Sequence, residues 1–274
     1  MLLGASVVTV YCAHVALGPI AQRQSGRLIT VWSLVRIQLG PPTATKPPLH
    51  EGPHLTLATP AVVLFDLDGT LVDTAPDLTA AVNAVLREHH RPDVAVAAVR
   101  NMIGDGTAKM VERAFAATGS VPADLSPVVQ RFLAVYAGGV ANQSVVYPGV
   151  PETLEKLAAA GCRLAVCTNK PDALAEQLLT ALDLRRHFAV VVGGDVPHRK
   201  PDPRHLQLTL ERLGATGLAA VMVGDAGNDV ASARAAGMPV VLVPYGYTAV
   251  PASQLGADVV LNAFGDLPVA LGLG

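Results

Sequence analysis

Two aspartates, Asp66 and Asp68, stand directly after a short apolar run at residues 61–65. The run is rich in valine and is typical of a strand buried on both faces, as in a parallel sheet. In an extended chain, side chains two residues apart point to the same side, so these carboxylates repel unless a cation or a shared proton intervenes. A lone Asp-x-Asp-Gly is more often a turn, but the carboxyl end of such a strand is where α/β proteins bind ligands.

Further polar side chains follow later apolar runs of the chain. They are Thr168 and Asn169 after residues 163–167, Asp225 and Asp229 after residues 219–223, and Lys200 in a loop between these runs. Parallel strands bring their carboxyl ends to one edge of a sheet. We therefore expect all of these groups to meet the first two aspartates at that edge.

This combination of side chains favours phosphoryl transfer. Four aspartates at one edge would carry up to four negative charges, and a hard divalent cation such as Mg²⁺ is bound by carboxylates together with waters and substrate phosphate. The Lys200 ammonium and the Thr168 hydroxyl suit the oxygens of a phosphate group. Catalysis of phosphoryl transfer consists mostly of holding that group and neutralising its charge beside a nucleophile such as a carboxylate.

The elements that must position these residues alternate between strands and helices from residue 147 onward. Strands are predicted at 61–65, 163–167, 188–192, 219–223, 240–243 and 258–261. Helices are predicted at 150–161, 172–182 and 204–213, with a further helix ending at Gly237. This alternation predicts an α/β fold built on a parallel sheet.

A block of helices lies between the first strand and this alternating region. Apolar residues at helical spacing predict helices at 76–89, 94–102, 107–117 and 123–136. Thr74 is a candidate N-cap for the first of them. We interpret residues 75–146 as a helical cap inserted into a core made of residues 59–74 and 147–274. The glycine-containing loop 103–107 either points at a ligand or is an ordinary connection between helices.

Composition argues against several other classes of protein. Hydrophobic residues make up 51% and charged residues 15% of the chain, against a typical quarter for the latter, which predicts a filled globular core. A formal net charge of −2 gives no electrostatic reason to expect nucleic acid or an anionic membrane as a partner. Cys12, Cys162 and Cys167 have no spacing typical of a disulfide framework or a zinc site. A cytoplasmic location is therefore expected.

Residues 1–58 differ in character from the rest of the chain. Residues 1–20 are mostly apolar but interrupted, with no basic residue ahead of them, which disfavours a signal peptide or a spanning helix. Residues 21–42 resemble the conceptual translation of a transfer-RNA gene, and the proline-rich stretch 41–60 has no periodicity. We expect residues 1–58 to be a non-native or disordered extension. Translation from a later start would then need a codon other than AUG, because the next methionine is Met102.

Four short motifs follow one another along the chain. They are Asp66-x-Asp68-Gly-Thr-Leu, Thr168-Asn169, Lys200-Pro201 and Gly224-Asp225-x-x-x-Asp229. Each is weak alone, but together they resemble, in order, the four motifs of the haloacid dehalogenase superfamily. The stretches 104–106, 168–171, 192–195, 199–203 and 244–247 are further similar to bacterial phosphoglycolate phosphatases. The resemblance covers residues 61–274 and implies a Rossmann-like parallel sheet core with a small helical cap.

The resemblance also implies a role for each motif residue. Asp66 would attack phosphorus and form an aspartyl-phosphate, and Asp68 would protonate the leaving alkoxide and then activate water. Thr168 would hydrogen-bond the phosphoryl group, Asn169 would help to bind the substrate, and Lys200 would neutralise charge between Asp66 and the phosphate. Mg²⁺ would be held by Asp66, Asp225 and the backbone carbonyl of Asp68, with Asp229 supporting the site through water or hydrogen bonds.

The predicted function is hydrolysis of 2-phosphoglycolate by a Mg²⁺-dependent phosphomonoesterase, with a small phosphorylated metabolite as the ligand and a monomer or homodimer as the assembly. Lys170, Arg100 or Lys109 could contact the carboxylate of that substrate. The alternative is the same chemistry on a sugar phosphate, such as an amino-sugar 6-phosphate. A dehalogenase would not need the acid at Asp68, and a silent binding protein would be expected to lose a catalytic residue. A membrane-anchored phosphatase would depend on residues 1–58.

Several residues near the motifs are predicted to have structural roles only. Cys167 is expected to be buried and inert. Asn228 is expected to help form the turn before a helix. The histidines expected at the surface, rather than as metal ligands, are His89, His90, His198 and His205.

Overall fold

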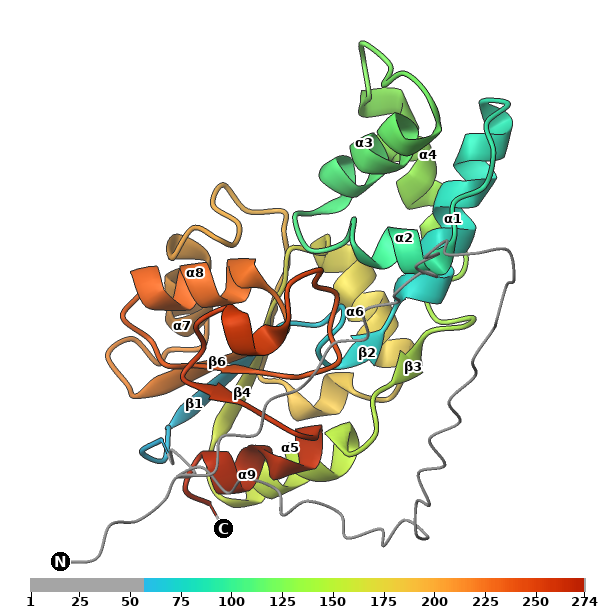
Figure 1. Ribbon diagram of the computed structural model, residues 1–274. Coiled ribbons are helices and arrows are strands. Elements are labelled where there is room, and N and C mark those ends of the chain that lie inside the picture. The colour runs from blue at the N-terminus through green and yellow to red at the C-terminus, as the bar shows by residue number, and fades with distance from the viewer. Residues whose placement is uncertain (1–56, 274) are drawn as a thin grey trace, which may run out of the picture. The chain divides into compact units, whose positions relative to one another are not determined.

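A six-stranded parallel sheet forms the core of the fold (Figure 1). The computed structural model describes residues 57–273, all within the unit Glu51–Gly274. The strands run in the order β5 (Val190–Val192), β4 (Arg163–Cys167), β1 (Val62–Phe65), β6 (Ala220–Gly224), β7 (Val240–Leu242) and β8 (Val259–Val260). β1 therefore pairs with β4 on one side and β6 on the other. The predicted α/β fold with a parallel sheet is confirmed.

Alternate side chains of the strands form apolar layers on the two faces of the sheet. Val63, Phe65 and Val166 belong to one layer, whereas Leu64 and Cys167 belong to the other. The core helices are α5 (Val150–Ala159), α6 (Asp172–Ala181), α7 (Arg204–Arg212), α8 (Gly227–Ala235) and α9 (Leu267–Ala270). Residues of α5, α6 and α9 fill the first layer, and residues of α7 and α8 fill the second. Coverage on both faces explains why the strands are almost wholly apolar.

Four helices occupy the chain between two very short strands, β2 (Val72–Asp73) and β3 (Val145–Val146). They are α1 (Ala75–Glu88), α2 (Val96–Arg100), α3 (Thr107–Thr118) and α4 (Ser126–Ala137). α1 packs against α2, α3 and α4, so the four helices form one group (Figure 1). β2 and β3 pair antiparallel, and sequence periodicity did not reveal them because two residues are too short to show a period. That residues 75–146 act as a cap stays a prediction.

The first turn of α1 differs from the sequence-based expectation. Thr74 occupies the N-cap position, but its hydroxyl makes no capping bond and has no hydrogen-bond partner. The Ala75 N–H instead donates to the Tyr247 hydroxyl at 3.0 Å and to Asp73 Oδ1 at 3.3 Å. The predicted side-chain cap is therefore wrong, and its place is taken by a residue far along the chain.

The prediction for residues 1–58 falls outside the described residues, apart from Leu57 and Ala58. Leu57 packs against the core, and its N–H donates to the Ala270 carbonyl at 3.0 Å. Across residues 57–273, no helix has the length and apolar character needed to cross a membrane.

Candidate active site

The first two aspartates leave β1 and line the same pocket. Asp66 is 6% exposed, and its Oδ1 accepts a hydrogen bond from the Leu67 N–H at 2.7 Å. Asp68 lies further out and forms an ion pair with Lys170 Nζ at 3.0 Å. Both residues line one pocket, although Asp66 pairs with Lys200 and Asp68 with Lys170.

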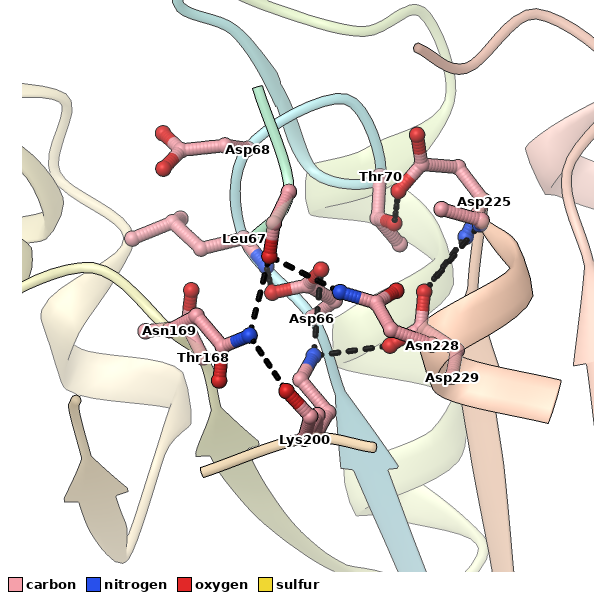
Figure 2. Close-up of polar contacts among 12 residues, drawn as sticks. Asp66, Leu67, Asp68, Thr70, Thr168, Asn169, Lys200, Asp225, Asn228 and Asp229 are labelled. Carbon is pink, nitrogen blue, oxygen red and sulfur yellow. Dashed lines mark hydrogen bonds and ion pairs between the residues drawn. The ribbon is translucent and has the colours of Figure 1, made fainter. Parts of the chain in front are cut away.

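Lys200 brings a positive charge to Asp66 from the buried side, behind the residues that line this pocket. Its side chain is fully buried, and its Nζ lies 3.1 Å from Asp66 Oδ2 and 2.7 Å from Asp229 Oδ1. Figure 2 shows the ammonium between these two carboxylates. The loop before α7 thus delivers the lysine to the end of β1, as the order of the motifs predicted.

Asp225 and Asp229 follow β6 and complete an acidic cluster (Figure 2). One carboxylate oxygen each from Asp66, Asp225 and Asp229 lies within 4.8 Å of the others, and all three residues are buried. Asp229 Oδ2 accepts hydrogen bonds from the Asp225 and Ala226 N–H groups, both at 3.1 Å. Asp225 Oδ1 accepts from the Thr70 hydroxyl at 3.0 Å. Asp229 therefore fixes the backbone that carries Asp225.

The electrostatics of this cluster suit a divalent cation. Burial, opposed by Lys200 and reinforced by Asp229, raises the pKa of Asp66 to about 6. Burial, with repulsion from Asp229 and Asp66, also raises the pKa of Asp225. Three buried carboxylates facing one ammonium leave a deficit of positive charge, and oxygen ligands of this kind are what Mg²⁺ selects. The residues present therefore fit a hard divalent ion.

Thr168 and Asn169 stand at the end of β4, as predicted, and both line the pocket. The Thr168 hydroxyl accepts a hydrogen bond from the Lys170 N–H at 3.3 Å. The Asn169 Nδ2 donates at 2.9 Å both to the Lys200 carbonyl and to the Gly104 carbonyl. The Asn169 amide therefore connects the lysine loop to the loop between α2 and α3, and its contact with substrate stays a prediction.

Asn228 was expected to form only a turn, and that expectation is incomplete. Its Nδ2 donates to the Gly104 carbonyl at 2.8 Å, so this carbonyl accepts hydrogen bonds from Asn169 and Asn228 together (Figure 2). Gly104 and Gly106 both line the pocket. The loop 103–107 thus belongs to the wall of the site, which was one of the two possibilities left open by its sequence.

Lys170 and Tyr136 form a second buried polar pair on the pocket wall. Lys170 Nζ donates to the Tyr136 hydroxyl at 2.8 Å and contacts Asp68, while its side chain is 3% exposed. The attraction of Asp68 and Tyr136 outweighs burial and raises the pKa of Lys170, so the ammonium stays charged. Sequence reasoning named Lys170 only as a substrate contact and missed its partner, because Tyr136 lies on α4 with no motif around it.

Of the other basic residues named as possible substrate contacts, neither lines this pocket. Arg100 pairs with Asp73 at 2.7 Å, and Lys109 pairs with Glu112 at 2.9 Å on an exposed surface. Lys170 is the only lysine or arginine among the described residues that line the pocket.

His205 was expected at the surface, and this expectation is wrong. The side chain is fully buried at the start of α7. Its Nδ1 accepts the Lys200 N–H at 3.3 Å, and its Nε2 lies 3.1 Å from the Gly193 carbonyl. Burial and the nearby Lys200 charge lower the pKa of His205 to about 4, so the ring is neutral and holds the lysine loop by hydrogen bonds. No pattern in the sequence indicated this role. Cys167 is buried, as predicted.

Comparison with known proteins identifies the family of this chain. Residues 63–243 match the family of haloacid dehalogenase-like hydrolases. A phosphoglycolate phosphatase of Caulobacter vibrioides is 46% identical over 213 residues, which is 77% of this chain and 90% of that protein. The predicted resemblance to bacterial phosphoglycolate phosphatases is thereby confirmed.

Two crystal structures share the fold. One, of a predicted phosphoglycolate phosphatase from Haemophilus somnus, has a TM-score of 0.70 and 33% identity, covering 76% of this chain and 96% of that one. The other, CbbY from Rhodobacter sphaeroides in complex with phosphate, has a TM-score of 0.68 and 26% identity, covering 78% of this chain and 100% of that one. On the family match and these likenesses, the chain belongs to the haloacid dehalogenase-like hydrolases.

Proposed function

We propose that this protein is a Mg²⁺-dependent phosphomonoesterase that hydrolyses 2-phosphoglycolate to glycolate and phosphate. The observation that carries the proposal is the meeting of Asp66, Lys200, Asp225 and Asp229 in one buried cluster, of which Asp66 and Asp225 line the pocket. A carboxylate nucleophile beside an ammonium and a divalent-ion site is what a phosphoryl group needs. The Caulobacter relative bears the name of this activity.

The reaction we propose proceeds in two steps. In the first, a carboxylate oxygen of Asp66 forms a bond to phosphorus while the bond from phosphorus to the ester oxygen breaks, and Asp68 gives a proton to the leaving alkoxide. In the second, Asp68 takes a proton from water, whose oxygen attacks phosphorus and frees the Asp66 carboxylate. Lys200 neutralises charge on the phosphoryl oxygens throughout, and the Thr168 hydroxyl, which lines the pocket, donates to one of them.

A bound Mg²⁺ would be held by Asp66 and Asp225, with Asp229 and the Asp68 carbonyl in support. Its chemistry is to neutralise the negative charge that Asp66 and the phosphate bring together. The chain's own contribution is to hold these carboxylates in place: Asp225 between Thr70 and Tyr247, and Asp229 against Lys200.

The pocket wall favours a small acid as the substrate. Most side chains that the helical block contributes to the wall are apolar, namely Leu78, Ile103, Met110 and Phe132, with Thr107 and Tyr136 as its hydroxyls. A sugar phosphate would bury several hydroxyl groups against these apolar side chains, and each hydroxyl left without a hydrogen-bond partner costs free energy. We propose that a carboxylate instead approaches Lys170, the one basic residue among the described residues that line the same pocket.

The substrate assignment is tested by measuring kcat/KM for phosphate release from a panel of small phosphomonoesters in the presence of Mg²⁺. We expect kcat/KM for 2-phosphoglycolate to be about 100-fold or more above that for hexose and amino-sugar 6-phosphates. Discrimination of this size is available when a polar group of one substrate has a hydrogen-bond partner in the site and that of the other has none. A higher kcat/KM for an amino-sugar 6-phosphate would instead establish the sugar phosphatase alternative.

The expected cytoplasmic location rests on the cysteines. Cys162 and Cys167 are both free and buried in the described part of the chain. Free thiols are compatible with a reducing compartment, and we propose the cytoplasm on that basis.

A further inference from the structure

The segment Pro244–Tyr247 follows β7 and encloses Asp225, although no role for it follows from the proposed reaction. The Tyr247 N–H donates to Asp225 Oδ2 at 2.6 Å. The Tyr245 hydroxyl donates at 3.1 Å to the carbonyl of Thr70, whose own hydroxyl donates to the other Asp225 oxygen. Both carboxylate oxygens of Asp225 are therefore held by groups that this segment provides or orients.

Close packing adds to these hydrogen bonds. A Cβ placed on Gly246 would lie 2.0 Å from the Asp225 Cβ, and one placed on Gly69 would lie 2.6 Å from Asp225 Oδ2. Gly69 also has φ of +84°, a conformation that favours glycine. The backbone thus approaches Asp225 from two sides, which leaves the carboxylate little freedom to rotate.

The Tyr247 hydroxyl connects this arrangement to the helical block. It donates to Asp73 Oδ1 at 2.6 Å and accepts the Ala75 N–H at 3.0 Å, so it satisfies the first turn of α1. The side chain is only 5% exposed. One residue therefore contacts the acidic cluster through its backbone and the start of the helical block through its hydroxyl.

We infer that Tyr247 is a positioning residue that orients Asp225 for a divalent cation and ties that orientation to the first turn of α1. The inference rests on the proposed function, because it assigns Asp225 to the cation site. The anchored hydroxyl fixes the ring, the ring fixes the backbone N–H, and the N–H fixes the Asp225 oxygen. Loss of the hydroxyl should therefore weaken binding of the cation, even though the hydroxyl does not touch the cluster.

The test is calorimetric titration of Mg²⁺ into the metal-free full-length chain, alongside kcat for phosphate release. Tyr247→Phe should raise the Mg²⁺ dissociation constant about tenfold or more, the effect typical of losing a group that orients a metal ligand. The matched control is Thr79→Val, which removes a hydroxyl from the same end of α1, where it bonds to the Ala75 carbonyl at 2.6 Å without contacting Asp225. Thr79→Val should change the dissociation constant less than twofold.

A dissociation constant for Tyr247→Phe within twofold of the wild type would overturn the inference, and so would an equal increase in Thr79→Val. In either case the proposed function would stand if the wild type still hydrolyses phosphomonoesters with Mg²⁺. If Tyr247→Phe does not fold, a second pair of variants tests the same hydrogen bond. Asp73→Asn weakens the acceptor of the Tyr247 hydroxyl. Arg100→Gln is its control, because it removes only the ion pair that Asp73 also makes. The inference is supported if Asp73→Asn binds Mg²⁺ more weakly than Arg100→Gln does. It is overturned if the two variants have the same Mg²⁺ dissociation constant.

Discussion

Replacing Asp66 with asparagine is expected to lower kcat for phosphate release by a factor on the order of 10³ or more while leaving the fold intact. Asparagine keeps the shape of the side chain and can still accept the Leu67 N–H, but its amide is a poor nucleophile. The measurement is steady-state phosphate release, with circular dichroism to verify the fold. Asp93→Asn, in an exposed ion pair with Arg87, is the matched control and should retain full activity.

The same variant has an expected effect on stability, with a sign that follows from the pKa of Asp66. Because that pKa is raised to about 6 from 3.8, the folded protein binds a proton more tightly than the unfolded chain. The free energy of unfolding of the metal-free wild type therefore falls as pH rises from about 4 to about 6. Asparagine carries no charge, so Asp66→Asn should be more stable than the wild type at pH 7, by about 1–3 kcal/mol. Near-normal turnover, or a large loss of stability, would refute the roles given to Asp66.

Replacing Lys200 with methionine is expected to reduce both activity and stability. The ammonium is fully buried between Asp66 and Asp229, and their attraction outweighs burial to raise the pKa of Lys200. Its removal leaves buried carboxylates without their cation, which should lower the free energy of unfolding by about 3–5 kcal/mol in the metal-free protein. Turnover should fall by about 100-fold or more, because a charge that stabilises the transition state is lost.

Urea unfolding at pH 7.5 and pH 5, with phosphate release measured in parallel, checks the Lys200 prediction. The loss of stability should be smaller at the lower pH, because the cluster carboxylates with raised pKa values take up protons there. Lys109→Met, which removes an exposed lysine paired with Glu112, is the control and should cost less than about 1 kcal/mol. Equal losses of unfolding free energy in the two lysine variants would contradict the burial of Lys200 between Asp66 and Asp229.

The sequence predicted the sheet and the strand ends well, for a physical reason. Buried parallel strands are apolar throughout, so the polar groups that interrupt them stand out, and the topology brings those groups to one edge. Asp66, Thr168 and Asp225 were found in this way, and Lys200 from its place in the order of motifs. These residues lie where that reasoning placed them.

The residues that sequence reasoning missed act through contacts between distant segments. Tyr247 caps α1 from 172 positions away, and Asn228 reaches Gly104 across 124 positions. His205 was assigned to the surface because a lone histidine in a polar helix carries no sign of burial, although it supports Lys200. Local patterns report periodicity and turns, and they do not report which loops a fold brings together.

The most direct test of the acidic cluster as a Mg²⁺-dependent phosphatase site is phosphate release from 2-phosphoglycolate by the full-length chain, first stripped of metal with a chelator and then titrated with Mg²⁺. We expect turnover to disappear in the chelated protein and to return as Mg²⁺ is added, with saturation at one ion per chain, because the buried carboxylates need that charge before a phosphate anion can approach Asp66. Undiminished turnover in the metal-free protein would contradict the account.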